Sequence, residues 1–204
     1  MSKKTLIWIC VIWIIITLLN YYIVPYFILA FEWIFMTVFL LIMTIIQIVK
    51  LIKERHQIKK QRFYSLLVIT SLFILTFYRD VPNRTIEKID WIILLNKRVK
   101  IVEQVKNNTL KPGKGKSGQI CELPFEFPIV SNGGNDIVFY KNRTDSTLTV
   151  KFWVFRNFFD SPSTYFVYTE DSEEKKQIEN LIEKHPKSNW KIKDNWYRVY
   201  RIGF

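Results

Sequence analysis

The sequence predicts a membrane protein in which an N-terminal block of three transmembrane helices precedes a small α+β domain with an antiparallel sheet. Three observations lead to this prediction. Apolar residues make up 49% of the 204 residues although the formal net charge is +12, which is typical of an integral membrane protein with a basic soluble part. From residue 5 to residue 78, charged side chains are confined to Glu32 and one short basic stretch. Farther along, runs of aromatic and β-branched residues predict strands.

The first apolar segment, residues 5–49, is too long for one helix, because roughly 20 apolar residues cross a bilayer. Pro25 and the tyrosines around it suit a turn at the headgroups, so we expect helices at about 5–22 and 27–49, and a third at 63–78. A cleaved signal peptide is the alternative for the first helix. No small-residue cleavage site follows it, and another apolar run comes almost at once, which favours an uncleaved helix.

Basic residues near the predicted helices set the orientation of the chain. The stretch between the second and third helices holds six of them against one acid, whereas the connection between the first and second helices has no charge. We therefore expect the N-terminus and this basic loop in the cytoplasm. The loop is a candidate contact for anionic lipids or a cytoplasmic partner, and no aromatic residues interleave its charges to stack on nucleic acid. Its basic residues are Lys50, Lys53, Arg55, Lys59, Lys60 and Arg62.

Residues 79–118 are expected to form an amphipathic helix and a linker that lead into the third part of the chain. Apolar residues at steps of three and four predict a helix at 84–106 that packs on the following domain through one stripe. Its WIILL centre alternatively rests on the membrane surface or forms a fourth, imperfect membrane segment. The stripe consists of Ile86, Ile89, Ile92, Leu95, Val99, Val102 and Val105.

The last part of the chain, residues 119–204, is the expected α+β domain outside the cytoplasm. A hairpin is predicted around NRTD, and in its second strand Val150 and Phe152 fall on one face while Thr149 and Lys151 fall on the other. Asp171 and Glu174 have the spacing of a capping box at the start of a helix. The predicted strands are 136–141, 146–155, 164–169, 190–193 and 196–202, with the helix at 171–185.

Known catalytic and cofactor motifs do not fit the chain. KPGKGKSG at 111–118 resembles the end of a P-loop, but Leu110 stands where the motif needs its first glycine, so a linker is expected. His56 and His185 have no Cys, Asp or Glu at ligand spacing, so no metal is expected. We predict no catalytic residues and no cofactor; the carboxylates of Glu122 and Asp160 are the basis of an enzyme alternative.

Glu32 is the most unusual residue of the predicted membrane block. A carboxylate within a span costs a few kcal/mol and is by default a functional hypothesis. It is expected to line a pore or a polar contact between protomers of a homo-oligomer, with Asn20 or Gln47 nearby. The alternative is that Glu32 lies close enough to the outer end of its helix to reach water.

Two resemblances add to this interpretation. The stretch SNGGNDIVFYKN, with FWVFRNFFDSPSTYFVYTED and NWYRVY, resembles a domain of uncharacterised small bacterial membrane proteins, some of which look like self-protection proteins that accompany secreted toxins. The layout of the whole chain, with its apolar run from Thr5 to Tyr78, is similar to the membrane accessory proteins of type VI-B CRISPR systems. That resemblance implies a modulator of RNA-targeting interference at the bacterial inner membrane, and it transfers no site residues.

The function expected from the sequence is therefore that of a non-enzymatic accessory or regulatory membrane protein of a bacterial defence system. The alternative is a membrane-anchored immunity protein whose exported domain neutralises a toxin. An envelope enzyme is the third possibility. The expected partners are membrane lipids and either a cytoplasmic effector protein or a protein that meets the exported domain.

Overall fold

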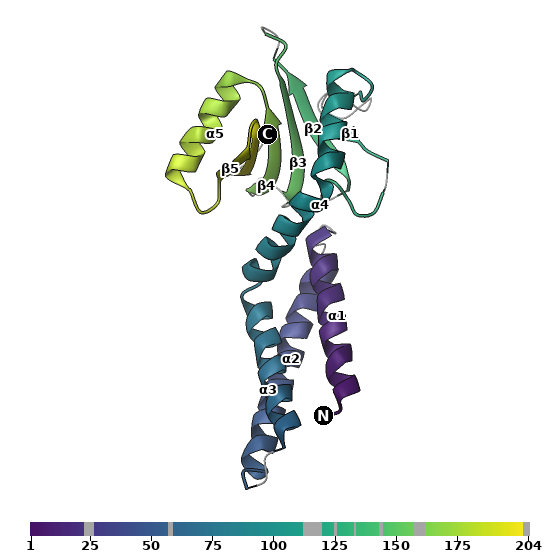
Figure 1. Ribbon diagram of the computed structural model, residues 1–204, viewed down its shortest axis with the longest axis vertical. Coiled ribbons are helices and arrows are strands. Elements are labelled where there is room, and N and C mark those ends of the chain that lie inside the picture. Colours follow the sequence, from purple (N-terminus) through teal and green to yellow (C-terminus); the bar gives the residue numbers. More distant parts are fainter. Residues whose placement is uncertain are drawn as a thin grey trace. The chain divides into compact units, whose positions relative to one another are not determined.

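The structure is a computed structural model of the chain, and its contacts divide the chain into two units. One unit comprises Met1–Tyr21 and Pro25–Lys88, and the other comprises Tyr22–Val24 and Ile89–Phe204. The first is helical and the second contains a sheet (Figure 1). The structure describes all residues except 23–26, 57–58, 112–119, 125, 133, 143–144, 157–161 and 202–204, and it leaves out the side chains of 27–30. Most of KPGKGKSG and Asp160 therefore lie outside the described residues.

Three helices build the first unit: α1 (Lys3–Tyr22), α2 (Phe27–Lys53) and α3 (Lys60–Phe77). By length and composition, α1 and residues 31–53 of α2 can each cross a membrane. The 18 residues of α3 reach this standard only together with the next helix, α4 (Asp80–Lys106), across a break at which the helix direction changes by 81°. The described residues thus contain two apolar helices of membrane-spanning length, or three if the bent pair counts as one.

The core of the first unit is a narrow seam between its helices, which includes Trp13 of α1, Leu40 of α2 and Ile69 of α3. The indole Nε1 of Trp13 donates a hydrogen bond of 2.7 Å to the hydroxyl of Thr76, which is fully buried. The outward faces of these helices remain apolar, and Phe35 of α2, for example, is 72% exposed. A thin core with an apolar exterior is the surface that a lipid environment requires.

The helix predicted at 84–106 is present as α4, but its packing face differs from the predicted stripe. Val102 and Val105 are buried as expected, whereas Ile89 is 52% and Ile92 is 73% exposed. The packed face instead carries Trp91, whose ring lies 4.8 Å from that of Phe166 between centroids. The error arose because α4 has apolar residues on two faces in its first half, and spacing alone does not tell which face meets the domain.

The second unit contains a six-stranded antiparallel sheet with the strand order β1-β2-β3-β4-β6-β5. The predicted strands are confirmed with small changes in their ends, and β1, only three residues long, adds to them. The hairpin predicted around NRTD joins β2 and β3. The strands are β1 (Ile120–Glu122), β2 (Asp136–Lys141), β3 (Leu148–Phe155), β4 (Ser163–Thr169), β5 (Trp190–Lys193) and β6 (Trp196–Arg201).

Both faces of the sheet are covered. Helix α5 (Ser172–Lys184) buries Ile178 against one face, in a cluster that includes Trp153 and Val167. On the other face Trp91 of α4 lies against Phe166 and Trp196. The α4 residues from Ile89 onward thus form a layer on the opposite side of the sheet from α5.

The start of α5 confirms half of the predicted capping box. The carboxylate of Asp171 accepts hydrogen bonds from the backbone N–H groups of Glu173 and Glu174, at 2.8 and 3.0 Å. The side chain of Glu174 does not return to the cap. It pairs with Arg201 of β6, and the hydroxyl of Thr169 accepts the hydrogen bond from the Asp171 N–H instead.

Candidate functional site

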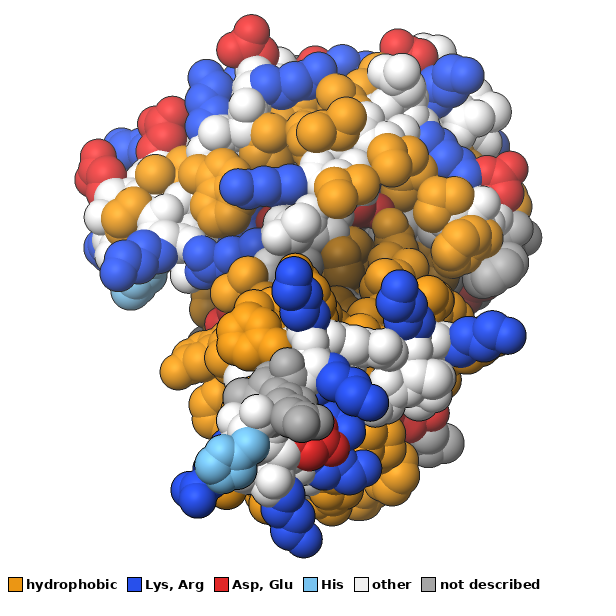
Figure 2. Space-filling view, turned by 60° about the horizontal axis from the view of Figure 1, so that its bottom comes forward, with side chains coloured by type: hydrophobic (Ala, Val, Ile, Leu, Met, Phe, Trp, Pro, Cys, Tyr) orange, Lys and Arg blue, Asp and Glu red, His pale blue; other side chains and the backbone are white. Residues whose placement is uncertain are grey.

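The predicted basic residues lie around the connection between α2 and α3. Lys50 and Lys53 belong to the last turn of α2, Lys59 is the N-cap residue of α3, and Lys60 begins that helix. These four side chains are exposed. Figure 2 shows Lys and Arg side chains gathered over this end of the helical unit. Four ammonium groups at the end of an apolar bundle attract acidic ligands at a membrane surface.

Arg62, the sixth predicted residue, is directed toward the protein instead. Its guanidinium donates two hydrogen bonds to the carboxylate of Glu54, with Nη2–Oε1 at 2.7 Å and Nε–Oε2 at 3.2 Å. This pairing with Arg62 lowers the pKa of the Glu54 carboxyl. Arg55 Nε donates to His56 Nε2 at 3.2 Å. Arg62 thus links the two ends of the α2–α3 connection through the one acid of the loop, which leaves the lysines and Arg55 to set its charge.

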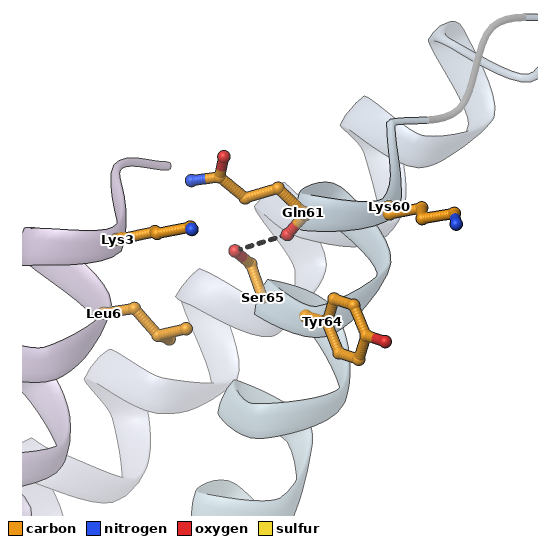
Figure 3. A pocket seen from close by; sticks show the side chains of 6 residues that line it. All are labelled: Lys3, Leu6, Lys60, Gln61, Tyr64 and Ser65. Carbon is orange, nitrogen blue, oxygen red and sulfur yellow. Dashed lines mark hydrogen bonds between the residues drawn. The ribbon is translucent and has the colours of Figure 1, made fainter.

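A cavity of about 510 Å³ lies beside these lysines, between the first turns of α1 and α3. Figure 3 shows the side chains of Lys3 and Leu6 reaching from α1 toward Gln61 and Ser65 of α3, with the Lys60 side chain directed away from Lys3. Gln61 Nε2 donates to the carbonyl oxygen of Met1 at 3.0 Å, which ties the two helix starts together. The lining residues are Lys3, Leu6, Lys60, Gln61, Tyr64 and Ser65.

The chemistry of this cavity suits an anionic ligand with an apolar part. Lys3 and Lys60 supply ammonium donors, and Gln61 supplies an amide donor. The ring of Tyr64 and the chain of Leu6 give the cavity apolar walls, and most of its lining surface is apolar. A phosphate group with an acyl chain attached matches this combination of cationic and apolar lining residues.

Sequence reasoning found Lys60 for this site and missed its other lining residues. Lys3 belongs to the N-terminal stretch that is predicted in the cytoplasm, Gln61 to the predicted basic loop, and Tyr64 and Ser65 to the predicted third helix. A usable signal existed, because the first and third helices of a three-helix block start on the same side of the membrane. Residues at the two starts can therefore meet.

Glu32 lies in the second turn of α2 and is exposed. Among the described residues it forms no hydrogen bond or ion pair. The two polar residues expected near Glu32 do not pair with it. The Asn20 amide donates to the carbonyl of Ile16 within α1 at 2.9 Å. Gln47 is 2% exposed and lies fifteen residues beyond Glu32 in α2, about 22 Å along the helix axis. A polar contact of Glu32 between protomers stays a prediction.

The second unit contains a buried ionic cluster under α5, formed by Lys151, Glu174 and Arg201. Lys151 Nζ lies 3.7 Å and Arg201 Nη2 2.7 Å from Glu174 Oε1. Burial, with the nearby charge of Arg201, lowers the pKa of Lys151 to about 8, although Glu174 opposes this. The ring centroid of Tyr140 lies 5.0 Å from Lys151 Nζ. Burial disfavours the charged form of this tyrosine as well and raises its pKa to about 12. Lys151 is 1% exposed, so this cluster is enclosed and offers no entry to a substrate.

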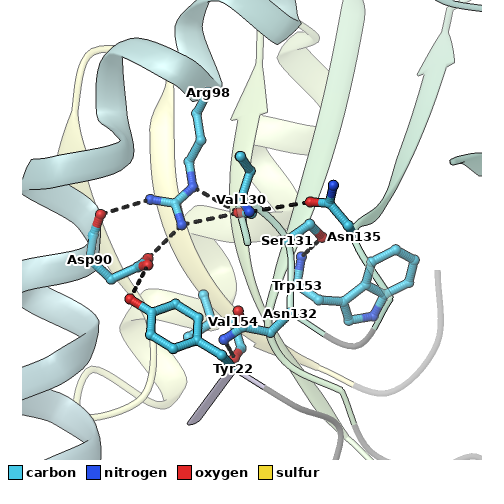
Figure 4. Close-up of polar contacts among 9 residues, drawn as sticks. All are labelled: Tyr22, Asp90, Arg98, Val130, Ser131, Asn132, Asn135, Trp153 and Val154. Carbon is cyan, nitrogen blue, oxygen red and sulfur yellow. Dashed lines mark hydrogen bonds and ion pairs between the residues drawn. The ribbon is translucent and has the colours of Figure 1, made fainter. Parts of the chain in front are cut away.

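A second buried network holds α4 on the opposite face. Arg98 donates to the Asp90 carboxylate at 2.5 Å and to the carbonyl oxygen of Val130 at 3.1 Å, and Tyr22 donates to the same carboxylate at 3.0 Å (Figure 4). The adjoining turn is fixed to β3, since Asn132 Nδ2 donates to the carbonyl of Val154 at 2.7 Å. Gly134 in this turn has φ +122°, the conformation that favours glycine there.

Other sequence candidates remain dispersed. His56 is exposed beside Arg55, His185 is the exposed C-cap residue of α5, and Glu122 is exposed in β1. In the part of the chain that the structure describes, three or more His, Cys, Asp or Glu side chains do not gather where a metal ion could bind. Comparison of the chain with protein-family models, curated proteins and solved structures found no match.

Proposed function

We propose that this protein is a non-enzymatic membrane protein that holds an acidic partner at the cytoplasmic surface of the bacterial inner membrane. Its contact surface is the basic rim, which we define as Lys3, Lys50, Lys53, Lys59 and Lys60. The observation that carries the proposal is the cavity between the starts of α1 and α3, where Lys3 and Lys60 flank an apolar wall. In this proposal the chain crosses the membrane three times and residues 119–204 lie outside the cytoplasm.

An anionic phospholipid is the first partner of the rim. Each basic residue near an anionic surface contributes about 1 kcal/mol, so neutralising two of them is expected to weaken headgroup binding about thirtyfold. The test is native mass spectrometry of the purified full-length protein titrated with phosphatidylglycerol. Lys3→Gln with Lys60→Gln should lose most of the lipid-bound signal. Lys176→Gln with Lys184→Gln, on exposed positions of α5, should retain it, and equal retention by both variants contradicts the proposal.

The wider role follows the resemblance of the chain layout to CRISPR accessory proteins. We propose that the lipid-bound rim presents a surface to a cytoplasmic effector of an RNA-targeting defence system. Phage plating on cells that carry such an effector should change when the protein is present. This change should disappear in the triple variant Lys53→Gln, Lys59→Gln and Lys60→Gln while the variant still fractionates with membranes.

The alternative, an immunity protein that acts through its exported domain, predicts the opposite pattern. If the protein acts in this way, the triple variant of Lys53, Lys59 and Lys60 should keep full activity, because none of its substitutions lies in residues 119–204. The matched triple variant Lys176→Gln, Lys184→Gln and Lys187→Gln changes the same number of exposed lysines in the second unit. The readout is protection of cells against an externally added toxin. If the loop variant still protects and the variant of Lys176, Lys184 and Lys187 does not, the result favours the immunity role over the effector role.

A further inference from the structure

A small apolar patch stands exposed on the second unit. Ile89, Ile92 and Ile93 on the outer face of α4 are 52%, 73% and 66% exposed, and Phe127 in the loop before β2 is 75% exposed. We call these four residues the interfacial patch. The inner face of the same helix turn carries Trp91 and Leu94 toward the sheet, so the isoleucines are not part of the core. Large side chains exposed together mark an interaction surface.

Contacts connect this patch to Tyr22. Tyr22 is the last residue of α1, whose 20 residues extend about 30 Å, the thickness of a hydrocarbon core. Its hydroxyl bonds to Asp90, and its ring lies 5.9 Å from that of Phe127, edge to face. Ile89, Ile92 and Ile93 lie within three residues of Asp90, less than about 5 Å along the helix axis. The patch therefore lies next to the residue that ends a helix of membrane-spanning length.

The outer face of α4 changes character just beyond the patch. Following the steps of three and four from Ile92, the same face continues with Asn96, Lys100 and Glu103, all exposed. Thus the apolar part of this face is confined to the turns nearest Tyr22, and the part farther away is polar or charged. The helix direction changes by 81° between α3 and α4, so α4 does not continue the direction of α3.

We propose that the interfacial patch is a lipid-contact surface, with the first half of α4 and the Phe127 loop seated at the boundary between headgroups and acyl chains. The occupant is the bilayer that α1 crosses in the proposed function, on which this inference rests, because the patch adjoins Tyr22, the residue that ends that helix. Tyr22 suits this position, since tyrosine is enriched at membrane–water interfaces. Lys88 and Arg84, exposed on the same part of α4, extend toward headgroup phosphates.

The test uses full-length protein in nanodiscs with a fluorophore on single cysteines, in a background that carries Cys10→Ala and Cys121→Ala. Ile92→Cys and Phe127→Cys report on the patch, and Glu103→Cys on the same helix face is the matched control. Both patch positions are more than two-thirds exposed, so the labels disturb no core. Elution as one sharp peak by size exclusion verifies folding. A lipid with a nitroxide near its headgroup and aqueous iodide are the two quenchers.

The proposal requires the nitroxide lipid to quench the labels at 92 and 127 by at least half, with iodide having little effect, while the label at 103 shows the reverse. Quenching by iodide alone at 92 and 127 means that the patch faces water and overturns the proposal. Protection from both quenchers means that a protein surface, such as a second copy of the chain, covers the patch, which also overturns it. Two separate positions keep the result independent of any one substitution.

Discussion

Arg98 is the residue on which the attachment of α4 to the sheet depends. Its guanidinium is 2% exposed, bonds to Asp90 and Val130, and lies 4.7 Å from the ring centroid of Phe166. Arg98→Met keeps the volume but leaves the Asp90 carboxylate buried without its cation. We expect the free energy of unfolding to fall by about 3–5 kcal/mol, measured by denaturant titration of tryptophan fluorescence in detergent.

Lys97→Met is the matched control for that substitution. Lys97 is the neighbour of Arg98 and also forms an ion pair, with Glu126, but the side chains of this pair are 34% and 65% exposed. Exposed pairs contribute about 0–1 kcal/mol, so this variant should unfold close to the wild type. Similar losses in the two variants contradict the assignment of the buried pair as the anchor of α4.

Replacing Lys151, in contrast to replacing Arg98, is expected to stabilise the protein. Its pKa of about 8 in the folded chain lies below the ordinary 10.5, because burial disfavours the charged form. At neutral pH this costs about 3 kcal/mol. Lys151→Met removes the cost and leaves Glu174 paired with Arg201 at 2.7 Å, so it should raise the free energy of unfolding at pH 7 by about 1–3 kcal/mol.

The pH dependence of the free energy of unfolding tests whether the lowered pKa of Lys151 is the cause. Because the folded pKa is lowered, the unfolded chain binds more protons between pH 8 and 10.5, and wild-type stability contributed by Lys151 rises with pH across this window. The advantage of Lys151→Met should therefore shrink as the pH approaches 10. The exposed control Lys191→Met should change stability by less than about 0.5 kcal/mol at every pH. A loss of stability in Lys151→Met at pH 7 means that its pairing with Glu174 outweighs the burial.

Lys151 and Glu174 show what the sequence could not predict at the scale of single residues. Alternation in β3 correctly placed Thr149 and Lys151 on the face opposite Val150, but it could not tell that α5 covers that face and leaves both nearly inaccessible. The spacing of Asp171 and Glu174 identified the cap and assigned Glu174 to it. In the fold Glu174 serves Lys151 and Arg201, partners from distant strands that no local pattern reveals.

At the scale of elements, α5 depends on its cap. Asp171 accepts two backbone hydrogen bonds at the helix start, and its other oxygen accepts one from Asn142 Nδ2 at 2.8 Å, which links the helix to the β2–β3 connection. Asp171→Ala should lower the melting temperature measured by circular dichroism and cost about 1–2 kcal/mol. Ser172→Ala, at the exposed next position, is the control and should be near neutral. A neutral Asp171→Ala contradicts the role of the cap.

Element prediction succeeded where a period was unambiguous. The apolar lengths gave α1 and α2 to within a few residues, and the β-branched and aromatic runs gave β2 to β6. It was wrong about the packing face of α4, where Ile89 and Ile92 have helical spacing but belong to a second, outward apolar face. It also missed β1, since three residues paired to β2 carry no period of their own.

At the scale of the whole molecule, the candidate site was harder to predict than the helices that carry it. The lysines of the loop were visible as a charge run, but the cavity needs the start of α1 next to the start of α3. This pairing depends on how the helices of the first unit pack. The bond from Gln61 to Met1 and the one from Trp13 to Thr76 show that α1 and α3 run side by side in the same direction.

That parallel arrangement decides the last prediction, the side of the membrane on which the sheet lies. If α1 leaves the cytoplasm, α3 does too, and the sheet follows α3 and α4 in the chain. We expect alkaline phosphatase, which is active only outside the cytoplasm, to work when fused after Phe204, and a fluorescent protein that matures only in the cytoplasm to stay dark there. Fusions of both reporters after His56 are the control and should give the reverse, because that loop lies on the side of Lys3. A fluorescent fusion after Phe204 would mean that α3 and α4 turn back without completing a span; the basic rim and the sheet would then face the same compartment, and one partner could contact both.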